Sequence, residues 1–370
     1  MPKFYLVLLL RADKRHLYTV MIRNAKMLPL GVLTALGILV CSNHALSSPP
    51  GFGSSLDEVV RLASKEGNVR IAASLVPGDV RVVLEGFYQK YPQIKVEYIR
   101  ITGVDESEKI LTETLAGTVE YDVVKLVAEQ QGRFVKAGVL AGPFEWRKYF
   151  LDIPKLNISP EGLMAGGSLY PEVIAYNPTM VPPERVPTKW EDCLDPYWRG
   201  KFVMDVRPFI LIGLYPEWGE EKVLDYAKKI KENRPIWKRG TESLTQVAAG
   251  EISMVCGTYY GSVFRMLRQD PQAHIRVAWP KEVPVLLNEV LGIMKGAKSP
   301  NAALLLAGWL ASPEGQRGYD LVGRGSPFLK GTKTWNVFQK AKSKPIFVGW
   351  DEAKIASLVT KKVSAIWGIR

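Results

Sequence analysis

Alternation between helical and strand-like patterns is the feature of this sequence that most constrains its fold. From Leu56 to Gly67 the apolar residues recur at helical spacing, and the strand-like segment 68–74 follows directly. The alternation continues with helical patterns at 80–91, 108–117 and 132–138 and strand patterns at 95–101 and 121–127. Successive βα units of this kind predict an α/β fold with a largely parallel sheet covered by helices.

A second α/β set follows an irregular stretch. Prolines and glycines interrupt every periodic run from Gly142 to Gly167, and new strand and helix patterns fill about 178–276. Apolar strands then return at 283–294, followed by one long helix at 302–323. Two crossings between the sets would form a hinge, so we predict lobe 1 from 48–142 plus 277–330, a crossover and hinge at 143–177, lobe 2 at 178–276, and a C-terminal helical segment at 331–370.

Residues 1–47 are expected to be a cleaved signal region. Arg23 and Lys26 precede an apolar run at 27–40, and small residues lead to Ser48. The run is short for a membrane span, although an uncleaved anchor stays an alternative. Residues 1–20 do not resemble a leader, so we expect that translation starts at Met21 and that the upstream residues are a mis-annotated start. Cleavage would leave 323 of the 370 residues, which fits two lobes in an exported, periplasmic protein.

The cysteines are few. Cys41 follows Val40, whereas lipid attachment usually needs a small residue there, so a lipid anchor is disfavoured. Cys193 and Cys256 lie beyond the signal region, in a compartment that permits disulfides. Their spacing does not indicate whether they pair or are buried thiols.

Composition excludes several classes of function. The formal net charge is +12, but the basic pairs Lys228–Lys229 and Lys361–Lys362 stand among opposite charges, which argues against a nucleic-acid partner. Only His274 of the 3 histidines lies beyond the signal region, so there is little material for a histidine metal site or a catalytic triad. No nucleophile-elbow, P-loop or zinc-protease motif occurs, and we predict a protein that is not an enzyme and requires no cofactor.

Six fragments occur in the same order as in a known family. They are LASKEGNVRI, YDVVKLV with VKAGVL, VIAYN, PTKWEDCLDPYWRGKFVMD, QVAAGE and GWLASPEGQ. Together they cover about residues 56–330, and the chain resembles the periplasmic substrate-binding proteins of ABC importers, most closely the ferric-ion- and thiamine-binding branch. The resemblance implies a two-lobed periplasmic-binding-protein fold of type II, with hinge strands between two βα sandwiches and a ligand cleft. It also implies a monomer that delivers a small ligand to an ABC permease and its ATPase, with a ligand sensor for a membrane receptor as the alternative.

In such sheets, ligands collect beyond the carboxyl ends of the strands. The candidate cleft loops are therefore Ala73–Asp79, Leu126–Gln130, Asp205–Pro208, Gly240–Ser243 and Gly257–Tyr260. The pair Tyr259–Tyr260 follows a predicted strand, as does the tyrosine pair that binds iron in the ferric-binding relatives. Fe(III) is a hard Lewis acid that can displace a phenolic proton, so Fe(III) is a candidate transported ligand.

The sequence departs from that ferric pattern. The first loop contains Ser74 but no histidine, and Glu129 comes slightly later than the carboxylate of the relatives. We retain Tyr259, Tyr260 and Glu129 as the candidate metal ligands if the ligand is ferric. A small organic ion remains the alternative, either a carboxylate, a phosphate-bearing molecule, or a cation such as thiamine or a polyamine.

Other loop residues are candidate ligand contacts. Arg207 follows a strand and has the geometry to clamp a carboxylate or phosphate, with an ordinary surface arginine as the alternative. Thr241 and Ser243 stand where a helix is predicted to begin, so helix capping is the default interpretation and anion binding the functional one. Ser74 is the candidate from the first loop.

Overall fold

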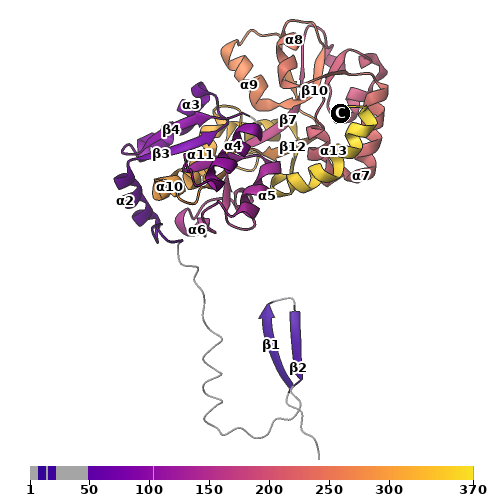
Figure 1. Ribbon diagram of the computed structural model, residues 1–370. Coiled ribbons are helices and arrows are strands. Elements are labelled where there is room, and N and C mark those ends of the chain that lie inside the picture. Colours follow the sequence, from indigo (N-terminus) through magenta and orange to yellow (C-terminus); the bar gives the residue numbers. More distant parts are fainter. Residues whose placement is uncertain (1–6, 14–15, 22–48, 103, 370) are drawn as a thin grey trace, which may run out of the picture. The chain divides into compact units, whose positions relative to one another are not determined.

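The computed structural model describes residues 7–13, 16–21, 49–102 and 104–369 (Figure 1). The chain divides into two compact units, residues 1–47 and 48–370. In the first unit, β1 (Val7–Asp13) pairs antiparallel with β2 (His16–Met21). The predicted signal segment beyond Met21, including Cys41, lies outside the described residues. Among the helices that the structure describes, none is long and apolar enough to cross a membrane.

The first sheet of residues 48–370 is built from the predicted βα units. Ser55 caps α2 (Leu56–Glu66) by accepting from the Glu58 amide, and Gly67 ends this helix with φ 72°. The units that follow are β3 (Asn68–Ala73), α3 (Pro77–Lys90), β4 (Lys95–Arg100), α4 (Val104–Leu115), β5 (Val123–Leu126) and α5 (Ala128–Ala137). The strand order is β4-β3-β5-β13-β6, where β13 (Val290–Ile293) and β6 (Met164–Gly166) complete the sheet. Strands β3, β4 and β5 are parallel, as predicted.

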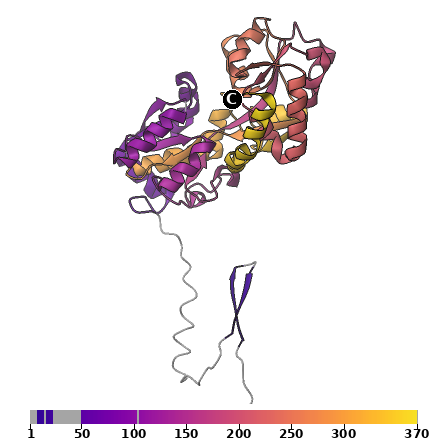
Figure 2. The same ribbon diagram turned by 45° about the vertical axis from the view of Figure 1, so that its right-hand side comes forward.

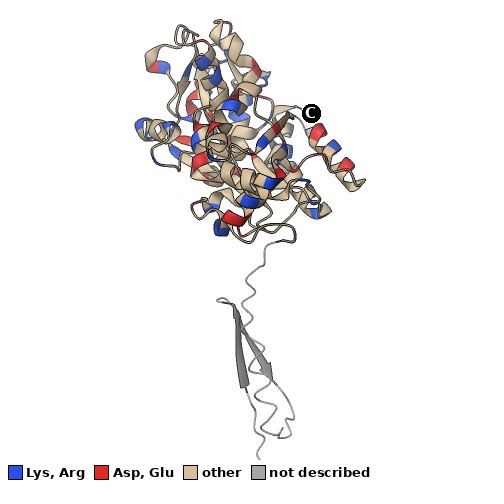
Figure 3. Cartoon of the chain, turned by 90° about the vertical axis from the view of Figure 1, so that its left-hand side faces the viewer, with Lys and Arg blue, Asp and Glu red and all other residues tan. Residues whose placement is uncertain are grey.

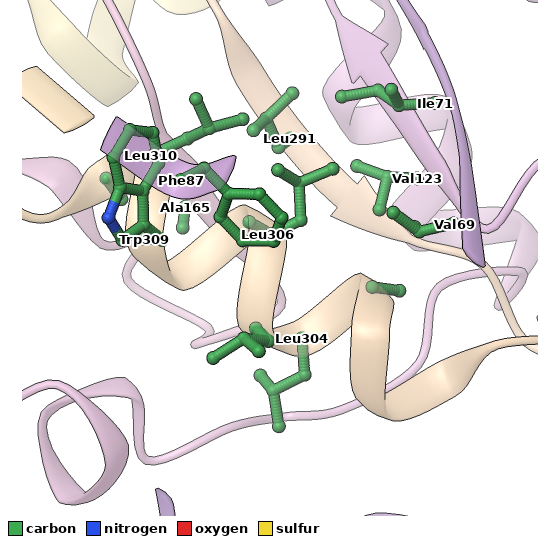
Figure 4. Close-up of a cluster of buried hydrophobic side chains, with 14 of the residues drawn as sticks. Val69, Ile71, Phe87, Val123, Ala165, Leu291, Leu304, Leu306, Trp309 and Leu310 are labelled. Carbon is green, nitrogen blue, oxygen red and sulfur yellow. The ribbon is translucent and has the colours of Figure 1, made fainter. Parts of the chain in front are cut away.

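Helix α10 (Pro300–Ala311) forms the centre of this lobe. Its residues from Asn301 to Ala311 are all buried, as expected for a helix that is apolar on every side. Leu304, Leu306 and Trp309 belong to the same core cluster as Phe87 and Leu291 (Figure 4). The helix packs against α2 and beneath the sheet, which fixes the position of β13.

The prediction of a single long helix at 302–323 is wrong. The chain breaks at Ser312, whose φ −74° and ψ 164° are extended, and α11 (Pro313–Asp320) begins at the next residue. A residue that precedes proline is disfavoured in the helical region, and proline is well suited to the first position of a new helix. The break turns α11 onto α3.

The second sheet has the order β14-β12-β7-β10-β8-β9, with β11 also paired to β7. Its strands are β7 (Leu169–Tyr176), β8 (Phe202–Asp205), β9 (Ile236–Lys238), β10 (Met254–Tyr259), β11 (Arg276–Ala278), β12 (Glu282–Leu287) and β14 (Lys344–Phe347). A disulfide joins Cys256 of β10 to Cys193, the pairing that the sequence left open. Both cysteines are buried.

The remaining helices are α6 (Trp146–Tyr149), α7 (Phe209–Glu232), α8 (Leu244–Ala248), α9 (Tyr260–Gln269), α12 (Lys333–Ala341) and α13 (Glu352–Trp367). Helix α13 packs along α7, so the C-terminal segment covers the second sheet (Figure 2). Residues 331–370, predicted as a C-terminal helical segment, contain α12 and α13 and also contribute β14. In Figure 2 the two sheets with their helices form two bodies side by side.

The chain passes between the two sheets at two adjacent places, and it crosses again between α11 and β14. Gly167 and Ser168 connect β6 to β7, while Asn288 and Glu289 connect β12 to β13. The Asn288 amide donates to the Ser168 carbonyl at 3.0 Å, so the two connections form a hydrogen-bonded hinge. Strands β7 and β12, predicted in the crossover and in lobe 1, both pair in the second sheet, and the exact lobe bounds stay a prediction.

We expect Gly167→Ala to destabilise the hinge. A Cβ atom at this position would lie 2.8 Å from the Tyr319 hydroxyl and 3.1 Å from the Glu289 carbonyl, so the hinge strands would have to move apart. Such overpacking costs about 1–3 kcal/mol. Urea unfolding measures the loss, and Gly132→Ala in α5 is the control, because a Cβ there meets nothing within 4 Å and helix propensity favours alanine. Equal stability of the two variants would contradict the prediction.

Charges are mixed over the surface. In the cartoon of Figure 3, positions of Lys and Arg are interspersed with positions of Asp and Glu along the chain. Surface ion pairs such as Lys109–Glu113 and Lys229–Asp225 show the same mixing within single helices. The absence of a nucleic-acid partner remains a prediction.

Candidate ligand-binding site

Three oxygen-bearing side chains lie on one face of the β7–β10 strand pair. Tyr170 and Glu172 are two residues apart in β7, so they point to the same side of the sheet. Tyr259, the last residue of β10, lies directly opposite Glu172 in the antiparallel register. Residues opposed in this way have Cβ atoms about 5 Å apart, so the two phenols and the carboxyl form one cluster beside the hinge.

A bulge in β10 aims Tyr259 at this cluster. The register shifts between Cys256 and Thr258, and Gly257 between them has φ 111°, which favours glycine. The shift leaves Gly257 unpaired and brings Tyr259 opposite Glu172. An isolated glycine within a strand pattern is therefore the local signal for the direction of the tyrosine.

The rings of the cluster contact one another and two arginines. Tyr170 and Tyr259 are in edge-to-face contact with their ring centroids 5.0 Å apart. The guanidinium of Arg324 lies 5.0 Å from the Tyr170 ring centroid. The guanidinium of Arg207 lies 4.6 Å from the ring of Phe209, which in turn is 6.4 Å from Tyr259. Positive charge therefore flanks both phenols.

Glu172 is the unusual member of the cluster. It is 3% exposed, and its carboxyl has no hydrogen bond or ion pair to any residue that the structure describes. Burial, and then the charge of Asp205, raises the pKa of Glu172 to about 8, with Arg207 acting in the opposite direction. A buried carboxyl without a partner is costly, and such groups gather at functional sites.

Asp205, unlike Glu172, has several hydrogen-bond partners. It accepts hydrogen bonds from the backbone amides of Arg207 and Gly240, each at 2.9 Å. It also accepts from the Arg207 side chain, from Nε at 3.0 Å and from Nη2 at 2.8 Å. Arg207 is thus already engaged in a bidentate pair with Asp205, and a second carboxylate would have to compete for the same guanidinium.

The first lobe reaches the cluster through Ser74. Its hydroxyl donates to Glu289, and it also forms a hydrogen bond with the Tyr170 phenol. Glu289 is 1% exposed and lies 3.5 Å from Arg324. Ser74, a predicted contact, therefore connects the end of β3 to Glu289 of the hinge and to Tyr170 of β7.

The two tyrosines of the predicted pair have different surroundings. Tyr260 is the first residue of α9, and its ring lies 4.8 Å from Trp279 and 5.7 Å from Phe264. Burial, followed by the charge of Asp320, raises the pKa of Tyr260 to about 12. Burial, followed by the charge of Glu172, raises the pKa of Tyr259 well above its ordinary value.

The other predicted site residues divide between the cavity and its surroundings. A small cavity is lined by Glu172, Asp205, Arg207, Phe209, Thr241 and Tyr259, so three predicted residues meet there. Neither Thr241 nor Ser243 caps a helix through its side chain, which corrects the capping interpretation: the buried Ser243 hydroxyl donates to the Arg239 carbonyl. Glu129 belongs to α5, and its side chain lies outside the described residues.

Two residues of the cluster, Tyr170 and Glu172, and the neighbouring Arg324 were missed in the sequence, while Asp205 was named only as the first residue of a candidate cleft loop. For Glu172 a signal existed, because it is the one charged residue in the strand LYPEVIAY. For Tyr170 and Arg324 the decisive contacts come from distant parts of the chain, which no local pattern reveals.

Comparison with known proteins agrees with this architecture. Residues 129–355 match the model of the family described as bacterial extracellular solute-binding protein. A search of curated proteins gives no match.

Three solved structures are similar over 81% of this chain and 99% of their own. They are iron-bound HitA from Pseudomonas aeruginosa (17% identity, TM-score 0.62), Trichodesmium IdiA (FutA) in complex with iron and citrate (22%, 0.64), and an ABC transporter substrate-binding protein from Bradyrhizobium japonicum (17%, 0.65). At these identities the likeness shows the fold alone. It confirms the predicted two-lobed fold, and with the family match it confirms the predicted resemblance. Because the family match spans more than half of the 370 residues, the protein belongs to the bacterial extracellular solute-binding proteins, a family of transport proteins that serve ABC importers.

Proposed function

We propose that the protein works outside the cytoplasmic membrane, where it captures ferric ion between its lobes and delivers the ion to an ABC permease. The observation that carries this proposal is the cluster of Tyr170, Glu172 and Tyr259 on one face of the β7–β10 pair. The protein itself performs no chemistry on its ligand in this role.

The donor atoms of the cluster suit a hard cation. Phenolate and carboxylate oxygens are the ligands that hard metal ions prefer, and Fe(III) is acidic enough to displace phenolic protons. The guanidiniums flanking the cluster favour this ionisation, since Arg324 lowers the pKa of Tyr170 and Arg207 lowers that of Tyr259 against the effect of burial. The bound cation would also provide the missing partner of Glu172.

This ligand set modifies the one predicted from the tyrosine pair. Tyr259 stays in the set, while Tyr170 takes the place of a second tyrosine because its ring contacts Tyr259. Tyr260 packs against Trp279 and Phe264, and it remains a predicted ligand together with Glu129. The solved relatives HitA and IdiA are described with bound iron, which supports ferric ion as the first ligand to test.

A visible absorption titration with ferric citrate tests the proposal. The protein from Ser48 onward is expected to develop a tyrosinate-to-iron charge-transfer band, which Tyr170→Phe and Tyr259→Phe each weaken, with affinity losses of more than about 100-fold. Even residues that only support a metal ligand contribute roughly 10- to 100-fold. Tyr260→Phe decides whether the adjacent tyrosine also binds. Absence of the band in the unmodified protein would eliminate iron as the ligand.

An organic cation is the second candidate, and the aromatic rings around Glu172 favour it. Phe209 and Tyr259 line the same cavity as this carboxyl, the Tyr170 ring contacts Tyr259, and aromatic faces with a carboxylate bind ammonium groups. Calorimetric titration with thiamine and with spermidine distinguishes this candidate. Heat of binding that disappears in Glu172→Gln, without any visible band with iron, would favour the organic cation.

A further inference from the structure

A cluster of ion pairs around a buried aspartate joins the two lobes. Asp79 lies in the first turn of α3, in the first lobe, and is fully buried. Its Oδ1 accepts from Nη2 of Arg268 at 2.5 Å, and its Oδ2 lies 3.9 Å from Nη1 of Arg265. Both arginines belong to α9, the helix that directly follows Tyr259 of the second sheet. The cluster therefore ties α9 to the opposite lobe.

The spacing of the arginines fits this contact. Arg265 and Arg268 are three residues apart in α9, so they lie on the same face of the helix. Their side chains are 28% and 37% exposed, whereas that of Asp79 is 0% exposed. The aspartate is thus enclosed by the lobe contact, while both arginines still reach solvent.

A second contact brings the same helix against the first lobe. A Cβ atom on Gly261 of α9 would lie 3.0 Å from the Gly323 carbonyl, and one on Gly323 would lie 2.7 Å from Cβ of Phe264. Gly323 follows α11 and directly precedes Arg324, which flanks Tyr170. The absence of side chains at these glycines lets α9 lie directly on the segment that carries Arg324.

We infer that Asp79 is a positioning residue whose pairing with Arg265 and Arg268 latches α9, and with it Tyr259 and Tyr260, against the first lobe. In the latched state, Arg324 lies against Tyr170, whose ring contacts Tyr259 within the second sheet. This inference goes beyond the proposed function, because it concerns the lobe contact and does not depend on which ligand the site takes.

The physical basis is the burial of Asp79. A buried carboxylate that loses its cationic partner is strongly destabilised, and Oδ2 has no hydrogen bond among the described residues. Separation of the lobes would return the carboxylate to water. Removal of the arginines therefore favours the open state, whereas an amide at position 79 removes the charge and leaves a weaker preference for closure.

The test compares three variants of the protein from Ser48 onward without ligand. They are the double variant Arg265→Gln with Arg268→Gln, the variant Asp79→Asn, and the control Glu314→Gln. The control breaks the Lys90–Glu314 pair at 2.8 Å, which joins α3 to α11 within the first lobe. Small-angle X-ray scattering measures the radius of gyration of each.

We expect the radius of gyration to rise most in the double arginine variant, less in Asp79→Asn, and not at all in Glu314→Gln. Superimposable scattering curves for all variants and the unmodified protein would overturn the inference. If the double variant lacks a folded near-ultraviolet circular dichroism spectrum, the isosteric Asp79→Asn decides alone, and an unchanged radius there overturns the inference.

A second readout follows the ligand. Release of iron to a chelator, measured as loss of the charge-transfer band, is expected to be about tenfold faster in both latch variants, which corresponds to about 1.4 kcal/mol. The band in the unmodified protein tests the proposed function, while the ligand-free scattering tests the latch. Failure of one is therefore distinguishable from failure of the other.

Discussion

Replacing Glu172 with glutamine is expected to stabilise the ligand-free protein at alkaline pH. The pKa of Glu172 is raised from 4.5 to about 8, chiefly by burial and then by the charge of Asp205. Between these values the folded protein holds a proton on Glu172 that the unfolded chain releases. The stability from this group is complete below pH 4.5 and is lost as pH rises through about 8.

The size of this loss of stability follows from the difference between the pKa of Glu172 in the folded protein and its ordinary value. The slope is at most about 1.4 kcal/mol per pH unit, so a few kcal/mol of stability should disappear from the unmodified protein across the window. Glu172→Gln lacks the ionisable group and should not show this decline. The charged groups that face Glu172 are Asp205 and Glu352, which raise its pKa, and Arg207, which lowers it.

Urea unfolding at pH 5 and pH 8.5 measures this prediction. The variant and the unmodified protein should differ little at the acidic value, and the variant should be the more stable at the alkaline one. The exposed Glu251, whose carboxylate accepts from Gln246, supplies the control Glu251→Gln. Parallel pH profiles for the unmodified protein and Glu172→Gln would contradict the structure's description of this carboxyl.

Loss of the Cys193–Cys256 disulfide is the other change with a large expected effect. The bond closes a loop of 63 residues. In the chain-entropy model, opening a loop of this length raises the conformational entropy of the unfolded chain, which lowers the free energy of unfolding by about 4 kcal/mol. Replacing both cysteines with alanine should therefore lower the midpoint of thermal unfolding by roughly 6 °C.

The same disulfide holds the strand that carries the site. Cys256 lies three residues before Tyr259, and both belong to β10. The double alanine variant should therefore also bind ferric ion more weakly. Reduction of the unmodified protein with dithiothreitol controls for the loss of the sulfur atoms, and it should reproduce the thermal shift. An unchanged midpoint under both conditions would mean that the bond contributes nothing to stability.

The fold was largely predictable because its signals are local. The alternating periodicities of the first lobe correspond to α2, β3, β4 and β5, where apolar spacing and punctuation by glycine and proline agree. The prediction of one long helix was wrong at Ser312, because α11 begins directly after α10 and the break is marked only by Ser312 and Pro313. The sheet to which β7 and β12 belong depends on long-range pairing, which periodicity does not encode.

The site was only partly predictable for the same reason. Arg207, Thr241 and Tyr259 were found because each follows a strand, where the ends of strands meet at one edge. Tyr170 and Glu172 lie within a strand near the hinge, and their role depends on the register between β7 and β10. Arg207 lines the cavity, but its pairing with Asp205 is a contact that the sequence pattern does not encode.

The position of the cluster next to the two crossings has a mechanical consequence. Tyr170 is two residues from Ser168, a span of about 7 Å along a strand, so a ligand bound at the proposed site would lie close to the hinge. When one lobe rotates about the hinge, a displacement of an ångström close to the hinge corresponds to a larger displacement at the parts of the lobe farthest from it. Binding of a single small ion could thereby produce a large change of shape on the surface that meets the permease.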